Sequence, residues 1–456
     1  MLVPKGSVNI KKNDFIHLAL LFWLTSIPYY TQIFSLCLLK VYNSFVSNYM
    51  IMETKDMKAI GIVAEFNPFH LGHAYFIKQA KQETGADYAL VMMSGDFVQR
   101  GAPACMDKYT RTTSALLGGA DLVLELPVVY ATASAEFFAR RAVCQLAETG
   151  VVDTICFGTK YPDFPFEFVA GKVLSPSKEF EDLIHSDISS GVPYPKARAN
   201  AIKQICNLEC EFKITDEMLE DPNTILGIEY TAAAIRCHMR IHPILRRGND
   251  YHDISMEGEF LSASAIRNAL EEDKDFSKGL SKEDALSIAK YKSQKKLLCA
   301  DDFSDLLYQT LLQHEATGYE DFLDCDIALS NRIQKHLKDY QSFTQFASLI
   351  KTKNYSYARI SRMLLHILLD IKSIPDHADY YRILGFRSDA TDLLSEIKQK
   401  SRIPLIAKMA NAFDFLSEEG KTLLQKDIYA AMLYEQIAYQ SAEKYHEMTQ
   451  SPIRIS

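Results

Sequence analysis

The stretch Lys58-Ala-Ile-Gly-Ile-Val-Ala-Glu-Phe-Asn-Pro-Phe-His-Leu-Gly-His73 decides the fold of this chain. Its first half is a short apolar run rich in β-branched residues, which predicts a buried strand followed by a helix. His70 and His73 are three residues apart and share one face of the first helical turn, and Gly72 lets a ligand approach the backbone. A helix N-terminus attracts phosphate, and two imidazoles there can donate hydrogen bonds as charge builds on phosphate oxygens. The pattern therefore indicates a site for phosphate chemistry; the alternative is a helix start with two surface histidines.

Strand and helix patterns alternate from this stretch to about residue 270. We expect strands at 60–64, 88–93, 121–126, 151–157 and 241–245, and helices at 73–84, 109–117, 134–148, 223–238 and 264–270. Such alternation predicts the α/β class, with a parallel, doubly wound, Rossmann-like sheet that binds ligands at the carboxyl ends of its strands. Five prolines make 160–222 look irregular, and after about 275 strand signals disappear. We therefore expect a nucleotide-binding domain at 57–275 and a mostly α-helical C-terminal domain at 276–456.

Residues 1–56 differ from the rest of the chain. Residues 15–39 carry no Asp, Glu, Lys or Arg and are long enough to span a bilayer. Met50, Met52 and Met57 could each start translation, and the first strand pattern begins directly after Met57. We interpret 1–56 as an extension outside the catalytic fold, with a start-site artefact favoured over a membrane anchor. No stable membrane partner is expected unless residues 15–39 are a real anchor.

The composition excludes several classes of protein. With 456 residues, 48% hydrophobic and 24% charged, the chain is neither disordered nor collagen-like nor a multi-span membrane protein. Its nine cysteines are odd in number and widely spread, which indicates reduced thiols and a cytoplasmic location. Cys206 and Cys210 are not followed by a second pair at zinc-ligand spacing, so we expect no protein metal site.

Further polar residues follow the predicted strands. Arg100, in the loop Ser94-Gly-Asp-Phe-Val-Gln-Arg-Gly101, can neutralise phosphate. Lys108 and Arg111 either extend this positive lining or lie on a solvated helix face. Gly158 either lets an adenine or ribose pack against bare backbone or is an ordinary turn glycine.

Three more groups lie near later helix starts. Asn223 is either a ligand contact or a helix N-cap. Arg246 and Arg247 supply cations where a triphosphate would lie. Ser264 and Arg267, in Ser262-Ala-Ser-Ala-Ile-Arg267, form either a second anion cradle or part of an N-cap.

The order of the motifs FNPFHLGH, SGDFVQRG, DLVLELP, FG, NTILGIEY, YHD and SASAIR resembles the tRNA(Met) cytidine acetate ligase family. HxGH by itself is a signature of the whole nucleotidyltransferase superfamily, of the HUP type, whereas the combination with SGDFVQRG is more specific. The likeness starts at Met57 and includes the tail segments 351–362 and 381–386. The family usually has Asn where this chain has Asp96, which leaves a polar role at this position in doubt.

The resemblance implies an ATP-dependent ligase. It implies that acetate is activated as acetyl-adenylate with release of pyrophosphate, and that the acetyl group passes to N4 of the wobble cytidine of elongator tRNA(Met). The implied ATP-binding residues are Val63, Ala64, Glu65, Phe66, Asn67, Pro68, Phe69, His70, Leu71, Gly72, His73, Ala74, Tyr75, Phe76, Gly158, Asn223 and Arg246, to which Arg247 is added as a neighbour.

For catalysis we expect in-line attack of acetate on the α-phosphorus of ATP. His70 and His73 would stabilise the charge that moves onto the α and β phosphates. Ser264 and Arg267, with Arg246, would hold the outer phosphates, and Mg²⁺ would screen them. No covalent nucleophile is required, because positioning and electrostatics suffice.

The tail carries a separate charge signal inside an acidic protein, which has 50 basic and 58 acidic residues and a net charge of −8. Residues 331–410 contain 14 Lys/Arg and 7 Asp/Glu, a balance of +7, whereas 301–330 contain eight acids and no Lys or Arg. A basic surface of this kind suits a polyanion, and Tyr and Arg side chains can contact phosphates and stack on unpaired bases. The residues that we expect to contact tRNA are Arg100, Lys351, Lys353, Tyr355, Arg359 and Arg362, the last three on one helical face. The alternative is a solvated amphipathic helix.

Two rival functions stay open at this point. A nicotinate or nicotinamide mononucleotide adenylyltransferase would share the HxGH loop but would not explain the long basic tail. A non-catalytic RNA- or membrane-associated scaffold would not need His70, His73 and Ser264. No motif reports the size of the acyl group, so acetate is not distinguished from another small carboxylate.

Overall fold

The computed structural model describes residues 57–456 except 248–259, 273 and 440–445. Lys58–Ser456 form one compact unit. Residues 1–56, including the apolar run 15–39, and the Tyr-His-Asp motif at 251–253 lie outside the described residues. No helix of the described part is long and apolar enough to cross a membrane.

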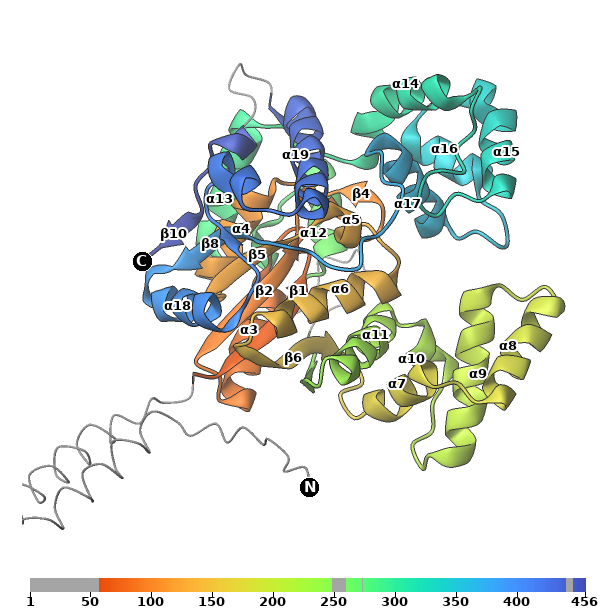
Figure 1. Ribbon diagram of the computed structural model, residues 1–456, viewed down its shortest axis with the longest axis horizontal. Helices are drawn as coiled ribbons and strands as arrows, with labels where there is room; N and C mark the ends of the chain where they lie inside the picture. Colours follow the sequence, from red (N-terminus) through yellow and green to blue (C-terminus); the bar gives the residue numbers. More distant parts are fainter. Residues whose placement is uncertain (1–56, 248–259, 273, 440–445) are drawn as a thin grey trace, which may run out of the picture. The chain divides into compact units, whose positions relative to one another are not determined.

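A mostly parallel sheet forms the centre of the unit (Figure 1). Its strand order is β10-β8-β5-β2-β1-β6-β7, with β9 paired to β8. The strands are β1 Ala59–Ala64, β2 Tyr88–Ser94, β5 Leu122–Leu126, β6 Val152–Thr159, β7 Arg240–Leu245, β8 Tyr381–Arg387, β9 Leu405–Ile406 and β10 Ile453–Ile455. A separate antiparallel hairpin joins β3 Phe97–Val98 to β4 Ala102–Pro103.

The strand order creates a ligand site at one place. From β1 the chain proceeds outward through β2 and β5 on one side, then returns and proceeds through β6 and β7 on the other. In a doubly wound sheet this reversal leaves a crevice outside the carboxyl ends of the two central strands. Here those ends are Ala64 of β1 and Thr159 of β6.

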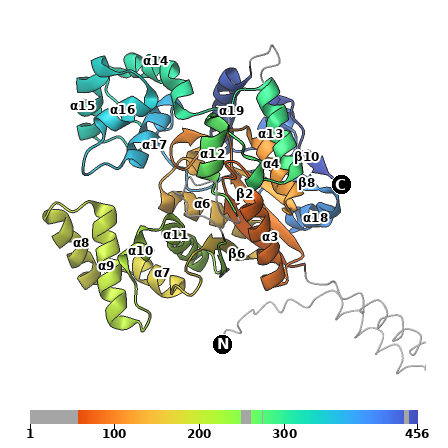
Figure 2. The same cartoon turned by 180° about the vertical axis from the view of Figure 1, so that it is seen from behind.

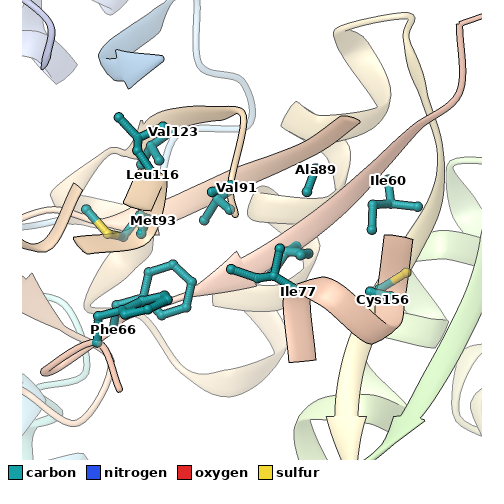
Figure 3. Packing of buried hydrophobic residues seen from close by; sticks show 14 of the residues in the cluster. Ile60, Phe66, Ile77, Ala89, Val91, Met93, Leu116, Val123 and Cys156 are labelled. Carbon is teal, nitrogen blue, oxygen red and sulfur yellow. The ribbon is translucent and has the colours of Figure 1, made fainter. Parts of the chain in front are cut away.

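Helices cover both faces of the sheet. Figure 1 shows α6 (Ala135–Glu148) in front of the strands, and the reverse view in Figure 2 shows α3 (Leu71–Thr84) and α4 (Lys108–Leu117) on the other face. Because side chains alternate along a strand, Ile60 and Ile62 pack in the cluster on the α3 side, with Ile77 among their partners (Figure 3). Gly61 faces α6, where an added Cβ would lie 3.0 Å from Leu146 Cδ1. The glycine therefore lets α6 approach β1 closely.

The remaining helices follow the sheet order along the chain. They are α5 Val128–Ala131, α7 Phe166–Leu174, α8 Lys178–Ser189, α9 Tyr194–Glu209, α10 Asp216–Glu220, α11 Pro222–Arg236, α12 Ala263–Glu271, α13 Lys282–Gln294, α14 Ser304–His314, α15 Ile327–His336, α16 Phe343–Ile350, α17 Tyr357–Leu368, α18 Thr391–Lys400 and α19 Glu418–Ala438. The α/β class and every strand and helix expected before residue 275 are confirmed, with ends that shift by at most two residues.

The prediction that 160–222 is irregular is wrong. Four helices, α7 to α10, fill this segment. Pro165 occupies the N-cap of α7, and Pro193 and Pro195 lie at the start of α9. Proline is favoured in the first turn of a helix, where its missing N–H costs nothing. These prolines therefore mark helix starts instead of breaks.

The expectation that strands end near residue 275 is also wrong. β8 pairs antiparallel with β5, and β10 pairs with β8, so the C-terminal segment extends the catalytic sheet. The apolar run of β8 is too short to be told from a helix by periodicity. It becomes a strand because the edge of β5 offers unpaired backbone groups. Outside these strands, residues 276–456 are mostly helical, as expected.

Candidate active site

A cavity of about 340 Å³ lies at the carboxyl ends of β1 and β6. It is lined by the loop from β1 into α3, the start of α12, the end of β7, and one face each of α6 and α11. Ten of the fourteen predicted loop residues line it: Val63, Ala64, Glu65, Phe66, Asn67, His70, Gly72, His73, Tyr75 and Phe76. Pro68, Phe69, Leu71 and Ala74 do not, and Phe69 instead packs in the hydrophobic core.

The two histidines are held by the first turn of α3. His70 is the N-cap, and its Nδ1 accepts a hydrogen bond from the Gly72 N–H at 3.1 Å. His73 Nδ1 accepts from the His70 N–H at 3.3 Å, and the two rings stack with centroids 3.7 Å apart. Because both Nδ1 atoms accept, each neutral ring carries its proton on Nε2. The pair thus provides two N–H donors at a helix N-terminus.

Both imidazoles are kept neutral. Burial, followed by the charges of Arg246 and Arg267, lowers the pKa of His70 to about 3. Burial, followed by His70 and then Arg246, lowers the pKa of His73 well below its usual value. The neighbouring guanidinium groups that oppose protonation would attract an anion. The site is therefore positive even though the imidazoles carry no charge.

Buried hydrogen bonds fix the loop that precedes α3. Arg111 is fully buried, and its Nη1 donates to the main-chain oxygens of Glu65 at 2.7 Å and Ser94 at 3.0 Å. The Asn67 side chain accepts a hydrogen bond from the Cys105 N–H at 2.8 Å. The main-chain oxygen of Asn67 accepts another from Arg267 Nη1. The ends of β1 and β2 and the start of α12 are thereby joined.

Both alternatives for Lys108 and Arg111, a positive lining and a solvated helix face, are wrong. Lys108 is 1% exposed and donates to Glu125 at 2.7 Å and to Glu447 at 3.0 Å. Neither Lys108 nor Arg111 faces solvent or the cavity. Asp96, the departure from the family pattern, is also buried, and its Oδ1 accepts from the Lys108 N–H at 2.9 Å. Lys108, Arg111 and Asp96 therefore hold buried structure together and do not contact a ligand in the cavity.

Gly158, Arg246 and Arg247 line the same cavity. A Cβ at Gly158 would lie 2.9 Å from Arg246 Cγ, so the glycine makes room for the Arg246 stem to cross the end of β6. Gly158 also lines the cavity, so its contact with an adenine or ribose stays a prediction. The Arg247 guanidinium lies over the Tyr75 ring, 5.3 Å from its centroid.

Asn223 is a cavity residue and not a cap. Asp221 caps α11, since its Oδ2 accepts from the Thr224 N–H at 2.8 Å. Asn223 lines the cavity, and its Nδ2 is buried without a hydrogen-bond partner among the described residues. A buried donor without a partner costs free energy, so this amide fits a ligand acceptor atom.

The start of α12 contributes a different serine from the one expected. Ser262 is the N-cap, lines the cavity and accepts from the Ala265 N–H at 3.0 Å. Ser264 does not line the cavity; its hydroxyl accepts from Arg267 Nη2 at 3.0 Å. Arg267 reaches the cavity, so Ser264 acts on the site through Arg267.

Residues from α6 and α11 were missed by sequence reasoning. Phe138, Leu226 and Tyr230 line the cavity from these helices, and Gln99 lines it together with its neighbour Arg100. Their spacing is that of any helix face, so it does not mark them as cavity residues. Phe138 lay outside every motif that the sequence analysis quoted, whereas Leu226 and Tyr230 lay inside NTILGIEY and Gln99 lay inside SGDFVQRG.

The predicted tRNA residues lie on and beside α17. Lys351 and Lys353 are exposed in the loop before α17. Tyr355 also precedes the helix, so the expected single helical face is wrong; instead, the Arg359 guanidinium stacks on its ring at 4.9 Å. Arg362 is only 12% exposed and lies 3.8 Å from Asp324.

Asp326, in the acidic segment 301–330, pairs with two of the residues predicted to contact tRNA. Asp326 accepts from the Tyr355 hydroxyl at 2.8 Å and lies 3.7 Å from Arg359. Ser361 donates to the Gly101 main-chain oxygen at 2.9 Å, which packs α17 on the β3–β4 hairpin that carries Arg100. The hairpin therefore connects the cavity with α17 and with the preceding loop that carries Lys351 and Lys353.

The described residues contain no group of three or more His, Cys, Asp or Glu side chains that could hold a metal ion. Glu65 is the carboxylate that lines the cavity among these residues. Any Mg²⁺ would thus be bound mainly through the oxygens of a triphosphate.

Comparisons with known proteins agree with this geometry. A family model described as HIGH Nucleotidyl Transferase matches residues 57–450, and with the sheet order and the paired histidines it defines the class of the protein. The tRNA(Met) cytidine acetate ligase of Clostridium kluyveri is 36% identical over 399 residues, covering 82% of this chain and 96% of that protein. The same enzyme from Acetivibrio thermocellus is 34% identical, covering 83% and 94%. The chain therefore belongs to the tRNA(Met) cytidine acetate ligase family.

Solved structures give the same result. The crystal structure of Thermotoga maritima TmcAL in apo form I has a TM-score of 0.81 and 29% identity, covering 88% of this chain and 100% of that one. The form II crystal of the same protein, bound with alpha-thio ATP, has a TM-score of 0.78 and 28% identity. The resemblance read from the motifs is confirmed.

Proposed function

We propose that this chain is an ATP-dependent ligase that forms acetyl-adenylate and transfers the acetyl group to N4 of the wobble cytidine of elongator tRNA(Met). The observation that carries the proposal is the pair of Nε2–H donors of His70 and His73, which face a cavity that also contains Arg246 and Arg267. Family membership and the ATP analogue bound by the Thermotoga relative support it.

In the first half-reaction, acetate would attack the α-phosphorus of ATP and pyrophosphate would leave. The neutral His70 and His73 would donate to phosphate oxygens as negative charge moves toward pyrophosphate. Arg246 and Arg267 would bind the outer phosphates, with Ser264 holding Arg267 in place. The Asn223 Nδ2, which has no partner in the described part of the chain, would donate to a nucleotide acceptor atom. Mg²⁺ would supply charge screening on the triphosphate.

In the second half-reaction, the tRNA would approach from the side of the β3–β4 hairpin. Arg100 at the cavity edge, Lys351, Lys353 and the stacked Tyr355–Arg359 pair would contact phosphates or unpaired bases. Arg362, packed beside Asp324, would help to hold this loop. Free thiols and a tRNA substrate fit a cytoplasmic enzyme.

Acetate-dependent exchange of labelled pyrophosphate into ATP tests the first step. We expect exchange with acetate and none with nicotinate or nicotinamide mononucleotide as the acceptor. Mass spectrometry of elongator tRNA(Met) should then detect N4-acetylcytidine only when ATP and acetate are both present. Pyrophosphate release driven by a mononucleotide would contradict the proposal and favour an adenylyltransferase.

A further inference from the structure

Transfer of the acetyl group requires a group that accepts a proton. The exocyclic amine of cytosine is a weak nucleophile, because its lone pair is delocalised into the ring. Its proton must be lost as the new bond forms, and a positioned general base accelerates such a step. Resting on the proposed function, we propose that Glu65 is this general base.

Among the side chains that line the cavity, Glu65 is the one suited to accept a proton. His70 and His73 use Nδ1 to accept backbone hydrogen bonds, so their free nitrogens already carry protons. Burial raises the pKa of Tyr230, with a further contribution from Glu65, so the phenol stays protonated. Among the described residues that line the cavity, Glu65 is the carboxylate.

Glu65 is held in a fixed position with one oxygen free. Its Oε1 accepts from the Gln99 N–H at 2.8 Å, and its main-chain oxygen accepts from Arg111 at 2.7 Å. Oε2 has no hydrogen-bond partner among the described residues and can accept a proton. Glu65 is thus both anchored and available.

The anchor places Glu65 on the side from which RNA would enter. Gln99 precedes Arg100 and Gly101 at the tip of the β3–β4 hairpin, and the Gly101 oxygen accepts from Ser361 of α17. A cytidine that arrives along the loop before α17 would meet this edge of the cavity. His70 and His73, at the start of α3, line the same cavity.

The step balances without another reactant. The N4 lone pair attacks the acetyl carbonyl carbon, a C–N bond forms, and the C–O bond to the adenylate phosphate breaks. AMP leaves with that electron pair, and the N4 proton moves to the Glu65 carboxylate, which later releases it to water.

The test separates the two half-reactions in the full chain. Glu65→Gln keeps an oxygen to accept from the Gln99 N–H but is not basic. We expect a single-turnover acetyl transfer slowed by about 10²–10⁴-fold, and a loss of acetate-dependent pyrophosphate exchange that is at least about tenfold smaller than the loss of transfer. Glu65→Asp should transfer at an intermediate rate. Glu83→Gln, a matched change on α3 outside the cavity, should alter neither rate.

Transfer by Glu65→Gln at the wild-type rate would overturn the inference. Equal loss of exchange and transfer would also overturn it, because Glu65 would then act at the ATP site. Absence of exchange in the wild-type protein would instead reject the proposed function, which the exchange assay reports separately.

Discussion

Lys108 Nζ lies 3.0 Å from Glu447 Oε1, although the two residues are 339 positions apart. Both side chains are 1% exposed. Glu125 and Arg382 complete the cluster, with Arg382 Nη2 at 3.4 Å from Glu447. The C-terminal end of the chain therefore supplies a buried charge to Lys108, whose N–H donates to Asp96 in the loop that carries Arg100.

Removing one member of this cluster should destabilise the whole unit. Glu447→Gln removes one of the negative charges that balance the buried Lys108 ammonium. Breaking a buried ion pair in this way costs about 3–5 kcal/mol. We expect a loss of that size in the free energy of unfolding, measured by urea denaturation. Lys421→Met breaks a surface pair with Glu418 and should cost less than about 1 kcal/mol. Similar losses in both variants would contradict the prediction.

Asp96 should make stability depend on pH. Burial raises the pKa of Asp96 from 3.8 to about 7, against the opposing charge of Lys108. The folded state therefore binds a proton that the unfolded state has released, and this contribution is lost as pH rises through 7. Asp96→Asn keeps the acceptor for the Lys108 N–H and cannot ionise. Its melting temperature should exceed that of wild type by more at pH 8 than at pH 5; an equal difference at both would contradict this.

The histidine pair should act on chemistry more than on folding. His70→Asn retains an oxygen that can cap α3, but it places no donor where the imidazole Nε2–H lies. We expect pyrophosphate exchange to fall by about 10²–10³-fold, as for loss of one transition-state donor, with little change in melting temperature. His73→Ala should behave similarly. Near wild-type exchange in both variants would refute the role.

Asn223 should contribute to nucleotide affinity and not to stability. Its Nδ2 has no partner among the described residues, so Asn223→Ala removes an unsatisfied donor. We expect ATP binding, measured by calorimetry, to weaken by about 1–2 kcal/mol without loss of unfolding free energy. Asp221→Ala, which removes the true cap of α11, should show the opposite pattern. Unchanged ATP affinity in Asn223→Ala would contradict the assignment.

The loop before α17 should bind RNA through charge. Lys351→Glu and Lys353→Glu should each weaken tRNA binding and reduce the salt slope by about one. Pyrophosphate exchange should stay unchanged, because neither residue lines the cavity. Lys282→Glu, an equal charge change at an exposed position of α13, is the control. Equal effects of the control would assign the loss to net charge alone.

Local signals determined much of this protein. A β-branched run, two histidines at helical spacing and glycines at element ends predicted the strands, helices and phosphate-handling loop before residue 275. These features depend on backbone geometry and side-chain periodicity over a few residues, which a sequence displays directly. The family resemblance followed from the order of the same motifs.

Tertiary structure alone decided which charges face the cavity and which are buried. Lys108 and Arg111 look like surface cations in the sequence, yet they satisfy carboxylates and carbonyl oxygens beneath the site. The sequence allows Asn223 to be the N-cap of α11, but in the structure Asp221 is the N-cap. β8 becomes a strand because β5 offers an edge some 260 residues earlier, at a register pairing Leu122 with Phe386. Burial and long-range pairing depend on partners distant in the chain, so no local pattern could specify them.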